Sequence, residues 1–428
     1  MISSPKKLVL NNFRIVDESQ DFHGSVIVED GMIAEVLEGE ARAAGGLVID
    51  GGGLVLMPAL VDLHAHFREP GAPEKETLES ASLAAAAGGY GTVVCMANTD
   101  PVTDTLAQAA AIKHRCDALG LIDLYPALSL TRGMEGKALS EITRAAHSEV
   151  TRLFSEDGKD MPDERLFLAA FAASRRAGVT VSCHCDLDGE DAATGRALRL
   201  AARADARIHL AHVSTAAAVD LVRGAKQRRS GPAGCPVSCE VTPHHLALTE
   251  ADAAALGADS FGKVAPPLRS EADRRALVAA IAGGAIDAIA TDHAPHTKAG
   301  KERGAPGFSG LETAFAVCHT TLAAPGSAER DTISLSRLSS LLSAAPARIL
   351  GLGAAGPRGR GRIAPAYRAD LCVADLDAAW TVDPAAFKSR GKNSPFAGRG
   401  LRGRIIMTLH RGGVVFQQTA PQMSFPRN

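Results

Sequence analysis

The sequence predicts an α/β protein: a (β/α)8 barrel of the TIM type with a small β-sandwich domain formed by both chain ends. Three observations lead to this fold class. Eight apolar, strand-like runs alternate with Ala-rich helical stretches, most of these runs end in polar residues, and strand-like sequence without helices occupies both ends of the chain. The 428 residues exceed the about 250 residues of a typical barrel and leave room for a second domain.

Short alternating β-strands are expected in residues 1–57, where LVLNNFRIV and GSVIVEDGMIAEVL are separated by turn residues. A similar pattern returns in residues 356–428, for example in GRIIMTLHRGGVVF. We therefore predict that residues 1–57 and 356–428 form one small β domain, and that residues 58–355 form the barrel.

The predicted barrel strands follow one another at intervals of roughly 25–35 residues. They are ALVDLHAH (59–66), GTVVCMANT (91–99), IDLYPALSLT (122–131), VTRLFSEDG (150–158), VTVSCHC (179–185), RIHLAHVST (207–215), VSCEVTPHH (237–245) and IDAIATDHAPH (286–296). Polar residues at the carboxyl ends of eight parallel strands are typical of a barrel with its active site at that face.

Composition narrows the classes of function. A net charge of −2 argues against a large nucleic-acid interface, and the chain contains no run of about 18 apolar residues that would span a membrane. No signal peptide is recognisable in the first residues, and the eight cysteines do not fall into zinc-ribbon pairs. We expect a cytoplasmic enzyme with reduced cysteines.

His64 and His66 are the first candidate metal ligands. Side chains two apart on a strand share one face, so both imidazoles can point into the mouth of the barrel. A lone His-x-His pair is weak evidence and is better explained by packed or surface histidines, so other ligands are needed to support a metal site.

Four further ligand-type residues stand at the ends of other predicted strands. They are Asp157, His184, His212 and Asp292. Imidazole and carboxylate are the usual ligands of catalytic zinc. With Asp157 bridging the two pairs of histidines, the set would hold two metals about 3.5–4 Å apart.

Such a centre suits the hydrolysis of an amide at neutral pH, which requires hydroxide. Metal binding lowers the pKa of water from 15.7 to about 7, and the same metal polarises the carbonyl. Asp292 is placed to bind metal, to take the proton from the nucleophile and to pass it to the leaving nitrogen.

Other polar residues are better explained as structural. His244 and His245 are interpreted as packing or supporting residues rather than ligands, and His209 as structural. Lys159 could be proposed as a carbamylated ligand, but it follows Gly158 beyond the strand end, and a solvated charge is preferred.

A series of motifs along nearly the whole chain resembles the class I dihydroorotases of the amidohydrolase superfamily. In order, these are DLHAHFREPG, CMANTDP, SEDG, HLAHVST, EVTPHH, KVAPPLR, IATDHAPH, GFSGLETA and KNSPFAGRGLRGRI. The resemblance implies a zinc enzyme with one or two ions per chain that interconverts N-carbamoyl-L-aspartate and L-dihydroorotate in de novo pyrimidine synthesis.

Matched position by position, the resemblance implies roles for individual residues. Arg68, Asn98 and His296 would contact the substrate carboxylate. The six ligand-type residues would bind metal: His64, His66, Asp157, His184, His212 and Asp292. An Arg just after the metal histidines suits a bidentate grip on a carboxylate.

The sequence departs from the family pattern at three places. Ala265 stands where the family usually has Asn, the segment between His184 and His209 is shorter, and the Phe-Gly pair of a loop is replaced by Gly307-Phe308. These departures concern substrate contacts and leave the metal ligands intact.

Alternative functions remain at this point. One is another cyclic amidohydrolase, an allantoinase or a dihydropyrimidinase/hydantoinase, although these typically use a carboxylated Lys and lack the Arg at position 68. Another is a non-catalytic partner of aspartate transcarbamoylase, although such partners typically lose metal histidines. The sequence also leaves open a homodimer and a complex with an aspartate transcarbamoylase.

The segment TKAGKERGAPGFSG (297–310) is expected to be a mobile lid. It is rich in Gly and Lys and follows Asp292, and lids of this kind exclude water during catalysis.

Overall fold

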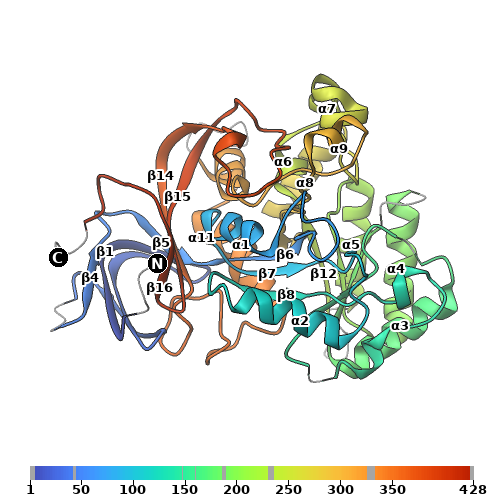
Figure 1. The fold of residues 1–428 in the computed structure, drawn as a ribbon, viewed down its shortest axis with the longest axis horizontal. Coiled ribbons are helices and arrows are strands. Elements are labelled where there is room, and N and C mark those ends of the chain that lie inside the picture. Colours follow the sequence, from blue (N-terminus) through green and yellow to red (C-terminus); the bar gives the residue numbers. More distant parts are fainter. Residues whose placement is uncertain are drawn as a thin grey trace.

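A computed structural model describes residues 5–41, 45–146, 148–159, 161–185, 189–229, 236–324 and 333–424. Parallel strands with helices outside them make up one part of the molecule, and a mainly antiparallel sheet makes up the other (Figure 1). Among the described residues, no helix combines the length and the apolar character needed to cross a lipid bilayer.

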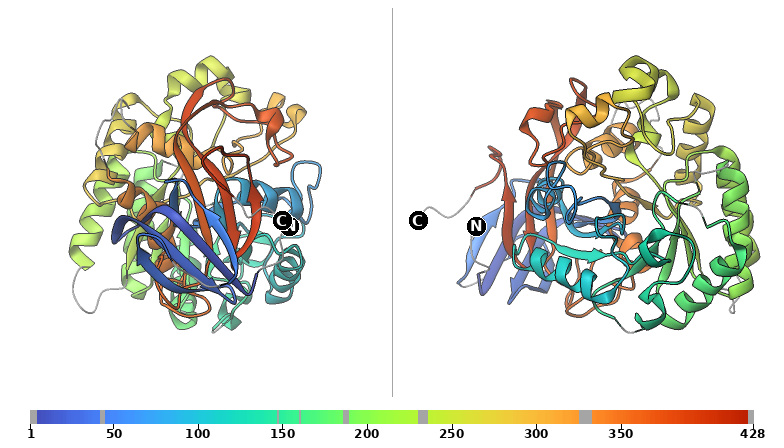
Figure 2. Two further views of the ribbon diagram at one scale, coloured as in Figure 1. Left: turned by 90° about the vertical axis from the view of Figure 1, so that its left-hand side faces the viewer. Right: turned by 45° about the vertical axis from the view of Figure 1, so that its right-hand side comes forward.

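The two chain ends meet in one sheet of eight strands. Its order is β16-β15-β14-β5-β1-β2-β3, and β4 pairs with β1. The strands are β1 (Lys7–Asp17), β2 (Gln20–Glu29), β3 (Met32–Glu38), β4 (Leu47–Asp50), β5 (Val55–Pro58), β14 (Leu371–Thr381), β15 (Gly400–His410) and β16 (Gly413–Gln417). The antiparallel pair of β5 and β14 joins the two ends, which lie side by side as blue and red strands in Figure 2. The sheet has an apolar core of its own, which includes Leu10, Phe13 and Met407.

Eight shorter parallel strands lie within the predicted barrel region, one in each predicted strand segment. They are β6 (Leu60–Ala65), β7 (Tyr90–Cys95), β8 (Asp123–Pro126), β9 (Leu153–Ser155), β10 (Thr180–Cys183), β11 (Ile208–Leu210), β12 (Val237–Val241) and β13 (Ala288–Ile289). They pair as a three-stranded sheet, β6-β7-β8, and a five-stranded sheet, β13-β12-β11-β10-β9.

Two isolated parallel bridges connect these sheets. Leu128 pairs with Phe154 at one junction, and Ala65 pairs with His293 at the other. The observed strands end earlier than the sequence predicts, because the polar residues that follow each apolar run leave the strand ladder and enter loops.

Helices cover the outer side of the parallel strands (Figure 1). They are α1 (Leu78–Ala87), α2 (Leu106–Asp117), α3 (Glu164–Ala177), α4 (Glu190–Ala204), α5 (Ala216–Arg229), α6 (Pro243–Ala247), α7 (Glu250–Leu256), α8 (Glu271–Ala282), α9 (Lys298–Glu302), α10 (Ala314–Cys318), α11 (Leu335–Ser339) and α12 (Ala345–Ile349). Short 3-10 or π turns are η1 (Arg132–Met134), η2 (Glu141–Arg144), η3 (Gly257–Phe261), η4 (His319–Ala323), η5 (Ser340–Ala344) and η6 (Pro384–Ala386).

Helix α3 shows how the sequence produces such a helix. Asp163 caps its N-terminus by accepting the backbone N–H groups of residues 165 and 166, and Gly178 ends it in the left-handed conformation. Phe167 and Phe171, four apart, lie on the buried face with ring centroids 4.7 Å from each other. The buried face thereby fixes the helix against the strands.

Candidate metal centre and substrate pocket

The six predicted metal ligands come together at the carboxyl ends of the parallel strands. His64 lies in β6 and His66 follows it, Asp157 follows β9, His184 follows β10, His212 follows β11, and Asp292 follows β13. All six side chains are buried, with exposed fractions of 1–7%. Five segments far apart in sequence thus deliver ligand-type groups to one place.

Distances within the centre are short. His66 Nε2 is 3.1 Å from Asp292 Oδ1, and His64 Nε2 is 3.4 Å from the same oxygen. Asp157 approaches two different histidines: its Oδ1 lies 2.9 Å from His184 Nδ1, and its Oδ2 lies 3.5 Å from His66 Nδ1. Asp157 therefore stands between the two sets of histidines, as a bridging ligand would.

Two groups of residues offer ligand atoms that lie within 4.8 Å of one another: His64, His184 and His212, and His64, His66 and Asp292. His64 belongs to both. His212 Nε2 is 3.1 Å from His184 Nδ1.

Unpaired buried atoms test whether a metal would fit here. His64 Nε2, His184 Nε2 and Asp157 Oδ2 are buried and have no hydrogen-bond partner among the described residues. Buried polar atoms are normally paired, and each of these three is a potential metal ligand. Buried ligand-type atoms without partners are what a metal centre would contain, so the donor set fits a metal such as zinc.

Electrostatics favours a cation in the same place. Burial lowers the pKa of His64, but three neighbouring carboxylates outweigh burial and raise it to about 10. Burial by itself would raise the pKa of Asp292, but the surrounding imidazoles lower this pKa by more. The pKa of Asp292 therefore lies well below its usual value. Asp292 is therefore ionised at neutral pH, as a ligand or proton acceptor must be.

Glu240 is a residue of the centre that sequence reasoning missed. Its Oε1 lies 3.3 Å from His64 Nδ1, and its Oε2 lies 3.0 Å from His209 Nε2. A carboxylate on the second ring nitrogen fixes the tautomer and orientation of a metal-binding His. His209, interpreted as structural, in turn holds Glu240. The sequence feature that could have revealed it is a single acidic residue, at position 240, within the apolar run that forms the buried strand β12.

The predicted substrate residues lie beside the centre. Arg68 Nη2 is 3.4 Å from His296 Nε2, and Arg68 Nε donates to the carbonyl of Pro295 at 3.3 Å. Asn98 is exposed, and its Oδ1 lies 3.0 Å from His66 Nδ1. Arg68 and His296 therefore form one unit, whereas Asn98 approaches the centre from the β7 side.

His296 is neutral in this setting. Burial lowers its pKa, and the guanidinium of Arg68 lowers it further, to about 3. Its Nδ1 has no hydrogen-bond partner among the residues that the structure describes, and its Nε2 is 2.8 Å from the carbonyl of Pro306. Because a carbonyl oxygen only accepts, the single proton of the neutral ring lies on Nε2, and the uncommitted Nδ1 is an acceptor that faces no added charge.

Backbone strain accumulates at the same place. Arg68, His212 and Asp292 adopt positive φ values of 57°, 33° and 45°. Non-glycine residues rarely take these angles, and such residues cluster at functional sites.

The predicted lid is anchored in this structure. Lys301 is fully buried, and its ammonium donates to the carbonyls of Lys263, Ala305 and Gly307 at 2.8–3.0 Å. Gly307, at φ +129°, packs against Ala294: an added Cβ would come within 2.5 Å of the Ala294 side chain. Mobility of residues 297–310 stays a prediction.

The remaining interpretations concern residues around the centre. His245 is buried, with Nδ1 2.8 Å from Thr242 Oγ1, which fits a packing role. His244 is buried against Phe308, and burial lowers its pKa to about 4. Lys159 is exposed and donates to the carbonyl of Met134 at 2.7 Å. Part of the shortened segment after His184, residues 186–188, lies outside the described residues.

Comparison with known proteins gives consistent matches. Residues 55–415 match the amidohydrolase family. Curated dihydroorotases are similar over the whole length: that of Clostridium botulinum is 34% identical over 96% of this chain and 100% of its own, and that of Anaeromyxobacter dehalogenans is 37% identical over 96% and 98%. The dihydroorotase of Deinococcus radiodurans is 36% identical over 96% and 99%.

Solved structures with a similar fold carry other names. The L-hydantoinase (dihydropyrimidinase) from Arthrobacter aurescens superposes with a TM-score of 0.85 at 26% identity, covering 97% of this chain and 96% of its own. A dihydropyrimidinase from Brevibacillus agri gives a TM-score of 0.82 at 22% identity, over 96% and 95% of the two chains.

Proposed function

We propose that this chain, which belongs to the amidohydrolase family and within it to the dihydroorotases, interconverts N-carbamoyl-L-aspartate and L-dihydroorotate at the centre described above. It is a cyclic amide hydrolase of pyrimidine biosynthesis. The observation that carries the choice of substrate is Arg68, half-buried beside the metal-ligand cluster and paired with a neutral His296.

The substrate and product share a carboxylate that takes no part in the reaction. Arg68 can present two N–H groups to this carboxylate, and the neutral His296 beside it adds no competing negative charge. Hydantoin and dihydrouracil lack this group. The superposed structures are named hydantoinase or dihydropyrimidinase. Arg68 nevertheless supports an acidic substrate, in agreement with the sequence relatives named dihydroorotase.

The metal would be zinc, one or two ions, held by His64, His66, Asp157, His184, His212 and Asp292. When bound, the metal would lower the pKa of a water molecule and polarise the amide carbonyl. The ionised Asp292 would accept the proton that the attacking water loses and deliver it to the ring nitrogen as the carbon–nitrogen bond breaks. Glu240 would hold the His64 ring in the required tautomer.

We also propose that the eight parallel strands close into a (β/α)8 barrel over residues 58–355. The bridges Leu128–Phe154 and Ala65–His293 support closure, as does a buried cluster with members from both sheets, among them Leu63 and Leu153. Residues 1–57 and 356–428 would form the second domain, a β-sandwich, around their separate core. A cytoplasmic location, a homodimer and assembly with an aspartate transcarbamoylase are compatible with this proposal.

Substrate choice tests the proposed function directly. Purified protein of measured metal content is assayed with dihydroorotate, dihydrouracil and hydantoin. We expect kcat/KM for dihydroorotate to exceed that for either neutral ring by at least about a hundredfold, since a site built for a polar group rejects ligands without it. Chelation should abolish turnover, and zinc should restore it. A preference for a neutral ring would contradict the proposal, and turnover that survives complete metal removal would contradict the metal role.

A further inference from the structure

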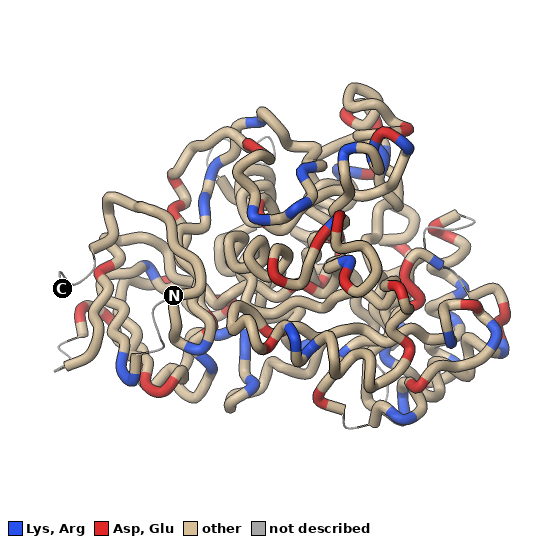
Figure 3. Tube along the Cα trace, viewed as in Figure 1, with Lys and Arg blue, Asp and Glu red and all other residues tan. Residues whose placement is uncertain are grey.

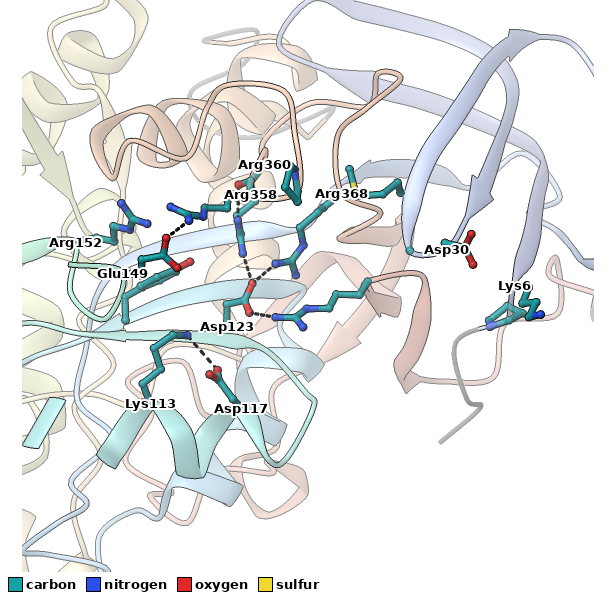
Figure 4. A pocket seen from close by; sticks show the side chains of 16 residues that line it. Lys6, Asp30, Lys113, Asp117, Asp123, Glu149, Arg152, Arg358, Arg360 and Arg368 are labelled. Atoms are coloured by element: carbon teal, nitrogen blue, oxygen red, sulfur yellow. Dashed lines mark hydrogen bonds and ion pairs between the residues drawn. The ribbon is translucent and has the colours of Figure 1, made fainter. Parts of the chain in front are cut away.

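Figure 4 shows a polar cavity that is separate from the metal-ligand cluster. It has a volume of about 690 Å³ and lies at the opposite end of the parallel strands from that cluster. Asp123, which lines it, is the first residue of β8, and Arg152 stands just before β9, whereas Asp157 follows the far end of β9. Nothing in the proposed reaction uses this cavity.

Cationic side chains dominate its wall. Seven Lys or Arg residues line the cavity, against four Asp or Glu residues. Elsewhere acidic and basic residues are interspersed along the chain (Figure 3), in keeping with the net charge of −2. The cavity is therefore a local excess of positive charge on a nearly neutral protein.

The buried end of the cavity is a cluster of three guanidiniums around Asp123. Arg368 Nη1 lies 2.7 Å and Arg411 Nη2 lies 2.9 Å from this carboxylate, and Arg360 also donates to it. Asp370 is the second carboxylate, 2.8 Å from Arg368 Nη2.

A metal ion does not fit this second cluster. Asp123, Asp370 and His410 offer ligand atoms close together, but their carboxylates already bind three guanidiniums. A metal would be repelled by these fixed positive charges at a distance of a few ångströms. The cluster is suited to an anion.

Uncommitted donors remain in the wall. Arg368 is only 7% exposed, yet its Nε has no hydrogen-bond partner among the described residues, and the same is true of the buried Nε of Arg152. Arg152 instead stacks over the Tyr125 ring, 5.6 Å from its centroid. Buried guanidinium donors without partners are costly, and a small shift of either side chain toward an acceptor-rich ligand in the cavity would relieve the cost.

We propose that this cavity binds a multiply charged phosphate compound of the size of a nucleoside di- or triphosphate. Guanidinium forks match phosphate oxygens, and several of them around one cavity suit several phosphate groups. The volume lies within the range of about 300–1,000 Å³ found for small-molecule sites and exceeds the need of a single phosphate. The carboxylates of Asp30, Asp117 and Glu149 in the same wall supply acceptors for hydroxyl or amino groups of a nucleoside.

Calorimetric titration of the full chain with inorganic pyrophosphate, UTP and ATP tests the proposal. The protein is first depleted of metal, so that chelation by phosphates contributes no heat. The test variant combines Arg358→Gln and Arg411→Gln. Both side chains are more than half exposed, at 54% and 58%, so the variant should fold, which its melting temperature checks. Arg203→Gln, on the exposed side of α4, is the control for loss of a positive charge outside the cavity.

We expect binding that weakens as salt is added and that falls at least tenfold in the double variant, with Arg203→Gln within twofold of the unaltered protein. Tighter binding of a nucleotide than of pyrophosphate assigns the site to nucleotides, and equal binding assigns it to free polyphosphate. Arg68→Met, which removes the cation beside the metal centre, should leave the affinity unchanged. No binding at millimolar concentrations, or binding that is lost in Arg68→Met and kept in the double variant, would overturn the proposal.

Discussion

Replacement of Arg68 by Met is the most informative perturbation of the proposed substrate pocket. In the free protein the change removes two contacts, to the Pro295 carbonyl at 3.3 Å and to His296 at 3.4 Å. Both are long, and each is worth about 1 kcal/mol or less, so the fold should persist. Because Arg68 is not among the metal ligands, the variant should also keep its metal.

The cost in catalysis is expected to be much larger. Loss of one partner of a desolvated charge pair costs about 3–5 kcal/mol. At 1.36 kcal/mol for each factor of ten, kcat/KM for dihydroorotate should fall by about two to four powers of ten. Arg68→Lys should recover only part of the loss, since Lys lacks the planar fork. Any residual turnover of hydantoin should be unaffected, because hydantoin has no carboxylate for Arg68 to bind.

A neighbouring arginine provides the control. Arg115 pairs with Glu69 and its side chain is 55% exposed. Because Glu69 pairs with Arg115, a surface salt bridge to Glu69 does not account for Arg68. Arg115→Met should change stability by about 1 kcal/mol or less and leave the kinetics unaltered. Kinetics of Arg68→Met close to those of the unaltered protein, at equal metal content, would refute the anchoring role and weaken the choice of dihydroorotase over the neutral-ring hydrolases.

Four further predictions concern metal binding, mobility and pH. His184→Ala should abolish turnover and lower the bound metal measured by elemental analysis, because its Nδ1 lies against Asp157 and its Nε2 is unpaired. Glu240→Gln should weaken metal binding about 10–100-fold in competition with a chelator, since it weakens the support of His64. Lys301→Met should speed hydrogen exchange around residues 300–307, where its ammonium now holds three carbonyls. Burial raises the pKa of Glu312 to about 7, above its unfolded value of 4.5, so its contribution to stability is complete below pH 4.5 and is lost as the pH rises through about 7. Denaturant titrations should show a loss of at most about 3 kcal/mol over this window, which Glu312→Gln removes.

Each of these predictions can fail separately. Unchanged metal content in the His184 variant would remove that residue from the ligand set. Ser238→Ala is the matched control for Glu240, because it takes away the 2.9 Å contact to His209 Nδ1 and the 3.3 Å hydrogen bond to the Ile208 carbonyl and leaves Glu240 in place. An equal effect of both substitutions would point to general loosening of β12. Exchange around residues 300–307 that is already fast would support the mobile lid over the anchored segment. An unaltered pH slope in the Glu312 variant would assign the slope to other groups.

The sequence by itself determined the alternation of strands and helices and the set of ligand-type residues. Apolar runs that end in His or Asp can be recognised locally, because a strand buries its apolar residues and leaves its polar carboxyl end for a loop. Each of the eight observed strands overlaps one predicted segment, and His64, Asp157 and His184 lie close together.

Only the tertiary structure decided how these groups are supported and paired. Glu240 is 176 residues from His64, so no local pattern could reveal their contact. Arg68 precedes Glu69 directly in sequence, yet it lies against His296, 228 residues away, while Glu69 pairs with Arg115. Strand ends were likewise set by the loops that follow them rather than by composition. The same physical reason applies to the Glu240 contact, the Arg68 contact and the strand ends. The partner of a charged or polar side chain depends on the packing of distant segments, whereas the apolar runs that become buried can be recognised from the local sequence.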